Sequence, residues 1–349
     1  MNENSTTMVS SKANDEGDGR EETTTTPVTI TKATYLFVMC ASLNSCNLGF
    51  DIGVSTEAGR LIQNDLGLTS EYRTHHKNHR ADDALGLAVL EICQGGLRCL
   101  CSVSFLAITE FKRELFIGSL NFWAMFGALL AQSISDRFGR RMTFVIAAVG
   151  FNLGILIMIL SHSLGTLLVG RTFIGWGIGI GLSIDPLFIA EITPPQHRGM
   201  LVTWSEIAIN IGVVFGFATG LFLSGLEDGL EWRVMFLLGA ILPTLMIIVV
   251  FTIMPESPRW LVQRGRHAEA LAILEQVYPE GFDVEPVLES IKEAIHVDCA
   301  TNMSMGWSFL RNPSPAVFRM LLVGVGAPLA QQAVGIDAIQ YYLGDVIAR

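Results

Sequence analysis

Charge is scarce in this sequence of 349 residues, because only 16% of them are Asp, Glu, Lys or Arg, whereas 50% are hydrophobic. The net charge of -10 comes largely from the amino-terminal tail and from the segment after Pro255. No basic surface emerges, so we expect no nucleic-acid partner. This composition predicts an integral membrane protein, with the lipid bilayer as its first partner.

Signals of enzymatic chemistry are also missing. No nucleophile, phosphate-binding loop or metal-ligand set occurs at usable spacing, so we expect neither an enzyme nor a cofactor. His75, His76 and His79 lack a completing acid or cysteine, which favours a solvated polar run over a metal site. The six cysteines are scattered, mostly in apolar runs, and predict no disulfide framework. We expect no signal peptide.

Long apolar runs are abundant instead. Each contains about twenty residues, enough to cross roughly 30 Å of hydrocarbon as a helix. Six such runs lie within residues 33–254, and a seventh begins near Phe318. Their approximate bounds are 33–54, 115–133, 142–162, 167–190, 201–223 and 234–254.

The link between the second and third runs carries a compact charge cluster. Arg137, Arg140 and Arg141 predict that this short link lies in the cytoplasm. Gly139 permits a tight reversal, and Asp136 adds an acid beside the arginines. The cluster is either a topology anchor alone or a mechanical element as well, since orientation needs positive charge but not this order of residues.

The remaining segments differ in composition from the spans. Residues 1–31 are polar and predict a disordered cytoplasmic tail. Residues 70–109 predict an insertion that does not cross, either extracellular or disordered, because another crossing would place the arginine cluster outside. Residues 255–317 predict a cytoplasmic helical linker, with helices near 259–277 and 284–297.

Two charged residues lie inside apolar runs near the predicted outer face. Asp51 on the first run and Arg171 on the fourth must face protein or water, and each is the obvious partner of the other. Protonating the acid would break such a pair, so the two residues predict a switch. The alternative is an acid that reaches the outer interface and has no function.

Polar residues also mark a cavity wall. Glu206 and Asn210 lie one turn apart on the fifth run. The seventh run, 318–349, carries many hydrogen-bonding groups that would be untenable against lipid, and these suit a polyhydroxyl ligand. They are Gln331, Gln332, Gly335, Asp337, Gln340, Tyr341 and Tyr342.

The ordered motifs resemble the sugar-porter family of the major facilitator superfamily. The matching stretches begin with Gly49-Phe50-Asp51-Ile52-Gly53 and Asp136-Arg137-Phe138-Gly139-Arg140-Arg141, and continue through Gly170-Arg171, Pro186 to Glu191, Arg198-Gly199, Pro255 to Leu261 and Gln331-Gln332-x-x-Gly335. Glu206 and Asp337 look like the polyol and monosaccharide proton symporters of that family.

The resemblance implies a fold and roles for individual residues. The implied fold is all-α: an amino-terminal six-helix bundle at 33–254, a cytoplasmic helical link, and the first helix of a carboxy-terminal bundle. Asp51 would accept the proton, with Arg171 as its partner. The implied substrate contacts are Glu206, Gln331, Gln332, Asp337 and Tyr341. The implied cytoplasmic gating network is Asp136, Arg137, Arg140, Arg141, Glu191, Arg198, Glu256 and Arg259.

The chain also departs from the family pattern. Gln132 stands where family members have Gly, the insertion has no counterpart, and the family's last five spans are missing. We therefore expect a fragment or an incomplete gene model, since a half-built cavity cannot alternate access.

Three functions stay open from the sequence. The complete protein is either a monomeric proton symporter of a polyol or monosaccharide, or a facilitator in which the Asp51–Arg171 pair is structural. The third alternative is a truncated fragment or sensor that transports nothing. For a transporter we expect the plasma membrane rather than the vacuolar or plastid membrane.

Overall fold

The computed structural model of the protein describes residues 6–9, 24–27, 29–65, 87–223, 230–305 and 315–335. Apart from two short strands, the regular structure in these ranges is helical. Seven of the described helical segments are long and apolar enough to cross a membrane. The predicted all-α membrane fold with seven spans is thereby confirmed.

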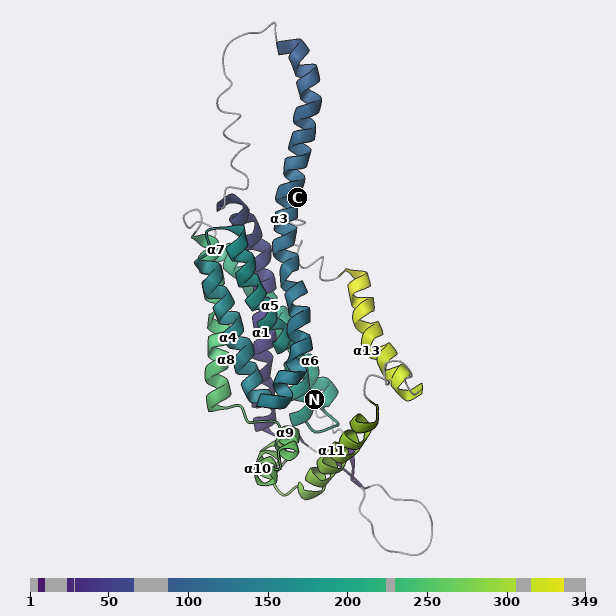
Figure 1. The fold of residues 1–349 in the computed structure, drawn as a ribbon. Helices are drawn as coiled ribbons and strands as arrows, with labels where there is room; N and C mark the ends of the chain where they lie inside the picture. Colours follow the sequence, from purple (N-terminus) through teal and green to yellow (C-terminus); the bar gives the residue numbers. More distant parts are fainter. Residues whose placement is uncertain are drawn as a thin grey trace, which may run out of the picture.

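Six spans stand side by side as a bundle (Figure 1). The sixth span is built from two helices that meet at Ala240. In chain order the bundle consists of α1 (Lys32–Asp65), α3 (Leu87–Phe138), α4 (Arg140–Ile159), α5 (Leu164–Ile192), α6 (Arg198–Leu223), α7 (Glu231–Gly239) and α8 (Ile241–Thr252).

The helices approach closely because glycines stand where they cross. A Cβ atom at Gly212 of α6 would lie 2.8 Å from the backbone nitrogen of Phe50 on α1, and one at Gly216 would lie 2.8 Å from Cα of Gly53. On α5, a Cβ at Gly177 would lie 2.9 Å from the backbone nitrogen of Phe151 on α4. Packing is thus what these glycines provide, as small residues do in membrane helices.

Apolar side chains divide between the interior and the outer face of the bundle. Trp232, Phe151 and Met158 are among the buried residues between the helices. Phe222 and Leu221 remain 87% and 79% exposed, as expected for residues that face lipid tails rather than water.

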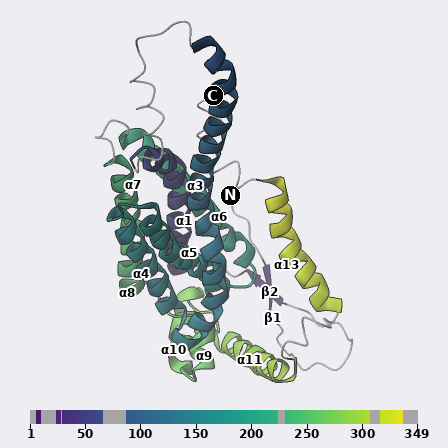
Figure 2. The same cartoon turned by 45° about the horizontal axis from the view of Figure 1, so that its top comes forward.

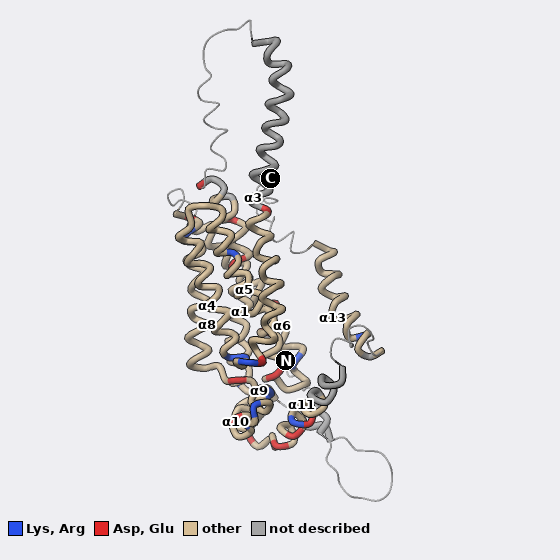
Figure 3. Tube along the Cα trace, viewed as in Figure 1, with Lys and Arg blue, Asp and Glu red and all other residues tan. Residues whose placement is uncertain are grey.

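A helical linker follows the bundle, in the region where one was predicted. It comprises α9 (Pro258–Gln263), α10 (His267–Val277) and α11 (Glu285–Met305). Ser257 caps α9 by accepting from the backbone N–H of Trp260, and Pro258 occupies the first turn, where its missing N–H costs nothing. Charged positions gather mainly around the end of the bundle that faces this linker (Figure 3).

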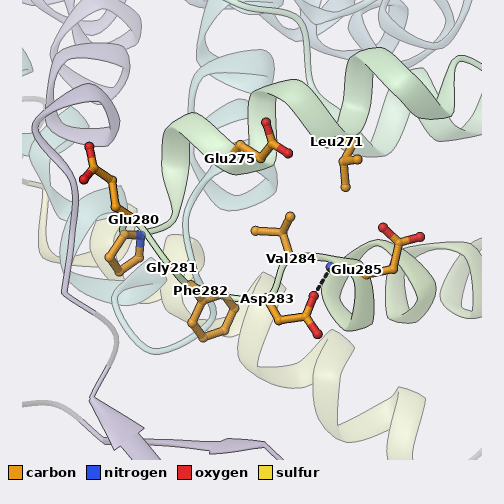
Figure 4. Close-up of a pocket in the computed structure, with 9 residues that line it drawn as sticks. Leu271, Glu275, Glu280, Gly281, Phe282, Asp283, Val284 and Glu285 are labelled. Atoms are coloured by element: carbon orange, nitrogen blue, oxygen red, sulfur yellow. Dashed lines mark hydrogen bonds between the residues drawn. The ribbon is translucent and has the colours of Figure 1, made fainter.

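The linker also forms a shallow hollow between α10 and α11. Four acids line it, and Asp283 accepts a hydrogen bond from the backbone N–H of Glu285 (Figure 4). Across the ranges that the structure describes, no cluster of His, Cys, Asp and Glu could hold a metal ion.

The amino-terminal tail differs from its prediction. β1 (Thr6–Val9) and β2 (Thr24–Pro27) pair antiparallel, whereas the sequence predicted no structure in residues 1–31 (Figure 2). Threonine accounts for five of these eight positions, and its β-branched side chain favours an extended backbone.

The predicted insertion is partly helical. α3 has 52 residues, which corresponds to about 78 Å and greatly exceeds the hydrocarbon thickness. Its amino-terminal part extends beyond the other helices, at the end opposite the linker (Figure 1). The disordered alternative is therefore wrong for 87–109, whereas 70–86 lies outside the described residues. That the insertion does not cross stays a prediction.

The seventh span stands apart from the bundle. α13 (Pro315–Val334) lies to one side of it in both views (Figures 1 and 2). None of the residues in its apolar window is buried. Gln331 and Gln332 on this helix are therefore exposed rather than enclosed between helices.

Candidate functional site

Asp51 of α1 and Arg171 of α5 form a buried ion pair. Arg171 Nη1 lies 2.8 Å from Asp51 Oδ2, and the two side chains are 0% and 2% exposed. Arg171 Nη2 donates to Ser55 Oγ at 2.6 Å, and Ser55 Oγ donates to the Asp51 backbone carbonyl at 2.5 Å. The structure thus brings together the two residues that the sequence predicted to pair.

Aromatic rings enclose the guanidinium of Arg171. Its Cζ lies 4.1 Å from the ring centroid of Phe116 on α3 and 5.3 Å from that of Phe236 on α7. Such rings attract a cation through their negative faces, most strongly where water is excluded. The sequence analysis missed both phenylalanines, because an aromatic residue in an apolar run has no distinguishing mark.

This geometry makes the charge state of Asp51 consequential. If the carboxylate gained a proton, Arg171 would lose its only ionic partner among the described residues while remaining fully buried. A buried charge without its partner is strongly unfavourable. Protonation must therefore be accompanied by rearrangement of α1 against α5 or by entry of water.

A second ion-pair group lies at the linker end of the bundle. Arg140 forms a two-pronged pair with Glu191, with Nε to Oε2 and Nη2 to Oε1 both at 2.8 Å. Its Nη1 also lies 3.3 Å from Asp136 Oδ1. The side chains of Arg140 and Glu191 are only 4% and 5% exposed. This largely buried pair therefore connects the start of α4 to the end of α5.

Glu256 joins this group from the end of the sixth span. Its Oε1 accepts from the backbone N–H groups of Arg140 and Arg141 at 2.8 and 3.2 Å. These are free donors at the start of α4, where a carboxylate is favoured. Gly139 precedes them with φ at 91°, a left-handed conformation that suits glycine. The turn therefore aims the amino terminus of α4 at Glu256.

The other predicted network residues have different neighbours. Arg141 Nε donates to the carbonyl of Val250 at 2.8 Å, and Arg137 lies over the ring of Phe138 at 5.5 Å. In the linker, burial raises the pKa of the Tyr278 phenol, and the positive charge of Arg198 opposes that rise. Arg259 lies on α9 and makes an interaction of its own, and its predicted place in the network stays a prediction.

Two linker residues that the sequence analysis did not assign complete the contact. Trp260 Nε1 donates to the Asp136 carbonyl at 3.1 Å. Arg264 Nη2 donates to the carbonyls of Asp136 and Arg137 at 3.0 and 2.8 Å. These carbonyls lack helical partners at the end of α3, so α9 caps that helix from outside.

Burial raises the pKa of Glu256 above its ordinary value of 4.5, although backbone donors and Arg140 oppose the rise. The folded protein then binds this proton more readily than the unfolded chain, so the associated stability is complete below pH 4.5 and declines as pH rises through the raised pKa. We expect Glu256→Gln to remove this decline. Unfolding curves across this pH range should show wild type losing stability relative to the variant.

The matched control for this prediction is Glu269→Gln, because Glu269 forms an exposed pair with Arg266. Because that pair is exposed to water, the variant should differ little in stability from wild type. A wild type that gains stability relative to Glu256→Gln as pH rises would contradict the expected direction.

Of the predicted substrate contacts, the structure describes Glu206, Gln331 and Gln332, and all three are exposed. Glu206 and Asn210 are exposed on α6, and Asn210 Nδ2 donates to the Glu206 carbonyl at 2.8 Å. Gln331 and Gln332 are exposed on α13, away from the bundle, while Asp337 and Tyr341 lie outside the described residues. The substrate assignment of these residues stays a prediction.

Comparison with known proteins identifies the family. Residues 37–349 match the family model described as "Sugar (and other) transporter". The chain belongs to the sugar transporter family. The sugar-porter membership predicted from the motifs is therefore confirmed.

Curated relatives in the sugar transporter family include plant proteins named for polyols. The chain is 35% identical over 308 residues to "Probable polyol transporter 4" of Arabidopsis thaliana, a match that covers 88% of this chain and 51% of the relative. It is 34% identical over 229 residues to "Inositol transporter 4" of the same plant, covering 64% and 39%. The chain thus spans about half the length of the curated relatives it matches.

Solved structures with the same fold include those of the xylose transporter XylE from E. coli. An inward-open structure of XylE matches with a TM-score of 0.64 at 21% identity, covering 90% of this chain and 64% of XylE. A structure of the proton:xylose symporter XylE bound to 6-bromo-6-deoxy-D-glucose matches with a TM-score of 0.71 at 21% identity, covering 90% and 62%. At this identity the similarity shows the major facilitator fold.

Proposed function

We propose that this chain supplies the first six-helix bundle of a proton-coupled symporter for a polyol or monosaccharide. The observation that carries the proposal is the Asp51–Arg171 pair, in which a buried acid and a buried guanidinium hold each other across α1 and α5. Ionisable residues inside a membrane domain are costly and mark ion or proton pathways. The relatives named for polyols and inositol support the substrate class.

The proton acts through the charge balance of the pair. While Asp51 is ionised, Arg171 is neutralised, and α1 and α5 are held together. A proton on the Asp51 carboxyl cancels this attraction, so that arrangement becomes unfavourable and another is populated. Substrate binding and proton binding would then favour the same transition, which is the basis of coupling.

The cytoplasmic group provides the second part of the proposal. Arg140, Glu191 and Glu256 connect α4, α5 and the end of the sixth span at the linker face. We assign this group to a cytoplasmic gate whose contacts must change when that face opens. Trp260 and Arg264 link the gate to α9, so the linker would move with it.

A facilitator is the alternative, and one observation favours it. Each terminal nitrogen of Arg171 already has a partner, Asp51 for one and Ser55 for the other, as in a permanent structural contact. In that case the pair would hold α1 to α5 throughout the transport cycle, and sugar would only equilibrate.

Replacing Asp51 with asparagine in the complete protein distinguishes these functions. We expect the variant to lose accumulation of radiolabelled sorbitol against a gradient, because the amide cannot take up a proton. Uptake of sorbitol, myo-inositol and xylose should be compared with and without a protonophore, at inward and zero pH gradients. Accumulation that survives in Asp51→Asn would reject the coupling role, and wild-type uptake that ignores the protonophore would favour the facilitator.

A further inference from the structure

A second acid lies inside the bundle, and the proposed function does not use it. Asp185 is on α5, 14 residues after Arg171, which places it about 21 Å further along the helix axis. It is 0% exposed, and it lies within the candidate span Leu164–Ile192. Asp185 therefore cannot belong to the Asp51–Arg171 pair.

Serines from two neighbouring helices face the Asp185 carboxyl group. Ser45 Oγ of α1 donates to Asp185 Oδ2. Ser205 of α6 also faces the carboxyl group. Asp185 Oδ1 and Ser205 Oγ are both buried, and neither has a hydrogen-bond partner of standard geometry. A small polar site thus lies between α1, α5 and α6, with one oxygen of the acid and one hydroxyl left over.

No positive charge neutralises this acid. Within the part of the chain that the structure describes, no Lys, Arg or His lies within ion-pair distance of Asp185. On α5 itself, Arg171 is paired with Asp51, and Glu191 is paired with Arg140. The other titratable or charged groups nearest in sequence to the facing serines are Cys46 on α1 and, on α6, the exposed Glu206 and the more distant Arg198.

An ionised carboxylate is unstable in such surroundings. Burial without a counter-charge strongly disfavours the charged form, and a carboxyl group in this situation takes up a proton instead. The neutral acid would also satisfy the leftover atoms, because a hydroxyl on Oδ1 can donate to Ser205 Oγ while Ser45 continues to donate to Oδ2.

We propose that Asp185, with Ser45 and Ser205, is a second proton-binding site of this protein. The bundle then holds two buried acids in opposite states, Asp51 ionised against Arg171 and Asp185 neutral between two serines. The chemical step is reversible: the carboxylate binds a proton to form the O–H bond, and releases it to water when α1 and α6 separate from α5.

The consequence of the Asp185 proton site for transport rests on the proposed function. If the complete protein is a symporter, each opening of the site to water on one side and closing on the other carries a proton. Asp185→Asn should then lower the number of protons moved per sorbitol without abolishing sorbitol uptake.

Infrared spectroscopy of the purified 349-residue chain in lipid tests the protonation itself. A neutral carboxyl group in an apolar site gives a C=O stretching band that a carboxylate lacks. We expect this band at neutral pH in wild type and in Asp51→Asn, and its loss in Asp185→Asn, whose amide matches the shape of the neutral acid. A wild type without the band, or an Asp185→Asn variant that keeps it, would overturn the proposal.

A milder variant covers the case in which Asp185→Asn does not fold. Ser45→Ala removes the donor to Oδ2 and should shift the C=O band to higher frequency while leaving it present. If Ser45→Ala does not change the C=O band, the band belongs to another acid and the proposal is overturned. If the carboxylate bands of wild type instead change on adding sodium ions, the site binds a metal cation and the proposal is wrong.

The two proposals fail separately. A protein that shows the Asp185 band but no proton-dependent uptake keeps the second proton site and loses the symport function. A protein that accumulates sorbitol through Asp51 but lacks the band keeps the symport function and loses the second site.

Discussion

Replacing Arg171 with leucine is expected to destabilise the bundle by about 3–5 kcal/mol, because it leaves the Asp51 carboxylate buried without its partner. The pair is 0% and 2% exposed, so water cannot take over the role of the guanidinium. The variant also loses the contacts of the cation with Phe116 and Phe236. Unfolding of the 349-residue chain by a denaturing detergent, followed by loss of helicity, measures the effect.

Two further variants make this prediction specific. Adding Asp51→Asn to Arg171→Leu should restore much of the lost stability, since the remaining buried group is then neutral. Arg266→Leu is the matched control, because Arg266 pairs with Glu269 where the side chains are 51% and 55% exposed, and such a pair contributes about 0–1 kcal/mol. If Arg171→Leu is no more damaging than Arg266→Leu, the pair is not the stabilising contact described above.

Replacing Gly212 with leucine is expected to prevent the bundle from forming. Any Cβ there would meet the backbone of Cys46 and Phe50 on α1, and backbone atoms cannot move aside as a flexible side chain can. α1 and α6 would have to separate along their whole crossing, because Gly49 and Gly53 meet α6 backbone in the same way. The measurement is the yield of monodisperse protein in detergent, together with the unfolding transition of whatever is recovered.

Gly199 provides the control on the same helix. A Cβ at Gly199 meets no atom within 4 Å, so Gly199→Leu should give wild-type yield and stability. Both substitutions add the same apolar side chain to α6, and only the packing differs. Similar behaviour of the two variants would show that the close approach of α1 and α6 does not limit folding.

The spans and the central pair could be predicted because each follows from a strong physical constraint. An apolar run of about twenty residues is long enough to cross the bilayer, and an Asp and an Arg near the same end of two such runs are expected to pair. Asp51 and Arg171 are 120 residues apart in sequence, yet burial leaves them few alternatives.

Other features could not be predicted because sequence carries no mark of which face a residue occupies. Phe116 lies against Arg171, whereas Phe222 is 87% exposed, and both belong to apolar runs of similar composition. Asp185 went unassigned although, like Asp51, it is an acid inside an apolar run, and nothing in the sequence indicates that Ser45 and Ser205 face it.

The insertion and the seventh span show two other limits. Residues 70–109 were predicted to be an insertion separate from the second span because another crossing would place the arginine cluster outside, but one helix continues through 87–138. Gln331 and Gln332 were predicted to line a cavity, which requires facing helices, whereas none of the residues in the apolar window of α13 is buried.

The most direct test of the central claim, that Asp51 carries the coupled proton, is the pH of the medium when sorbitol is added to cells expressing the complete protein. We expect wild type to make a weakly buffered medium more alkaline as protons enter with the polyol. We expect no such change in Asp51→Asn, even though preloaded labelled sorbitol still exchanges. Alkalinisation of equal size in Asp51→Asn would contradict this claim.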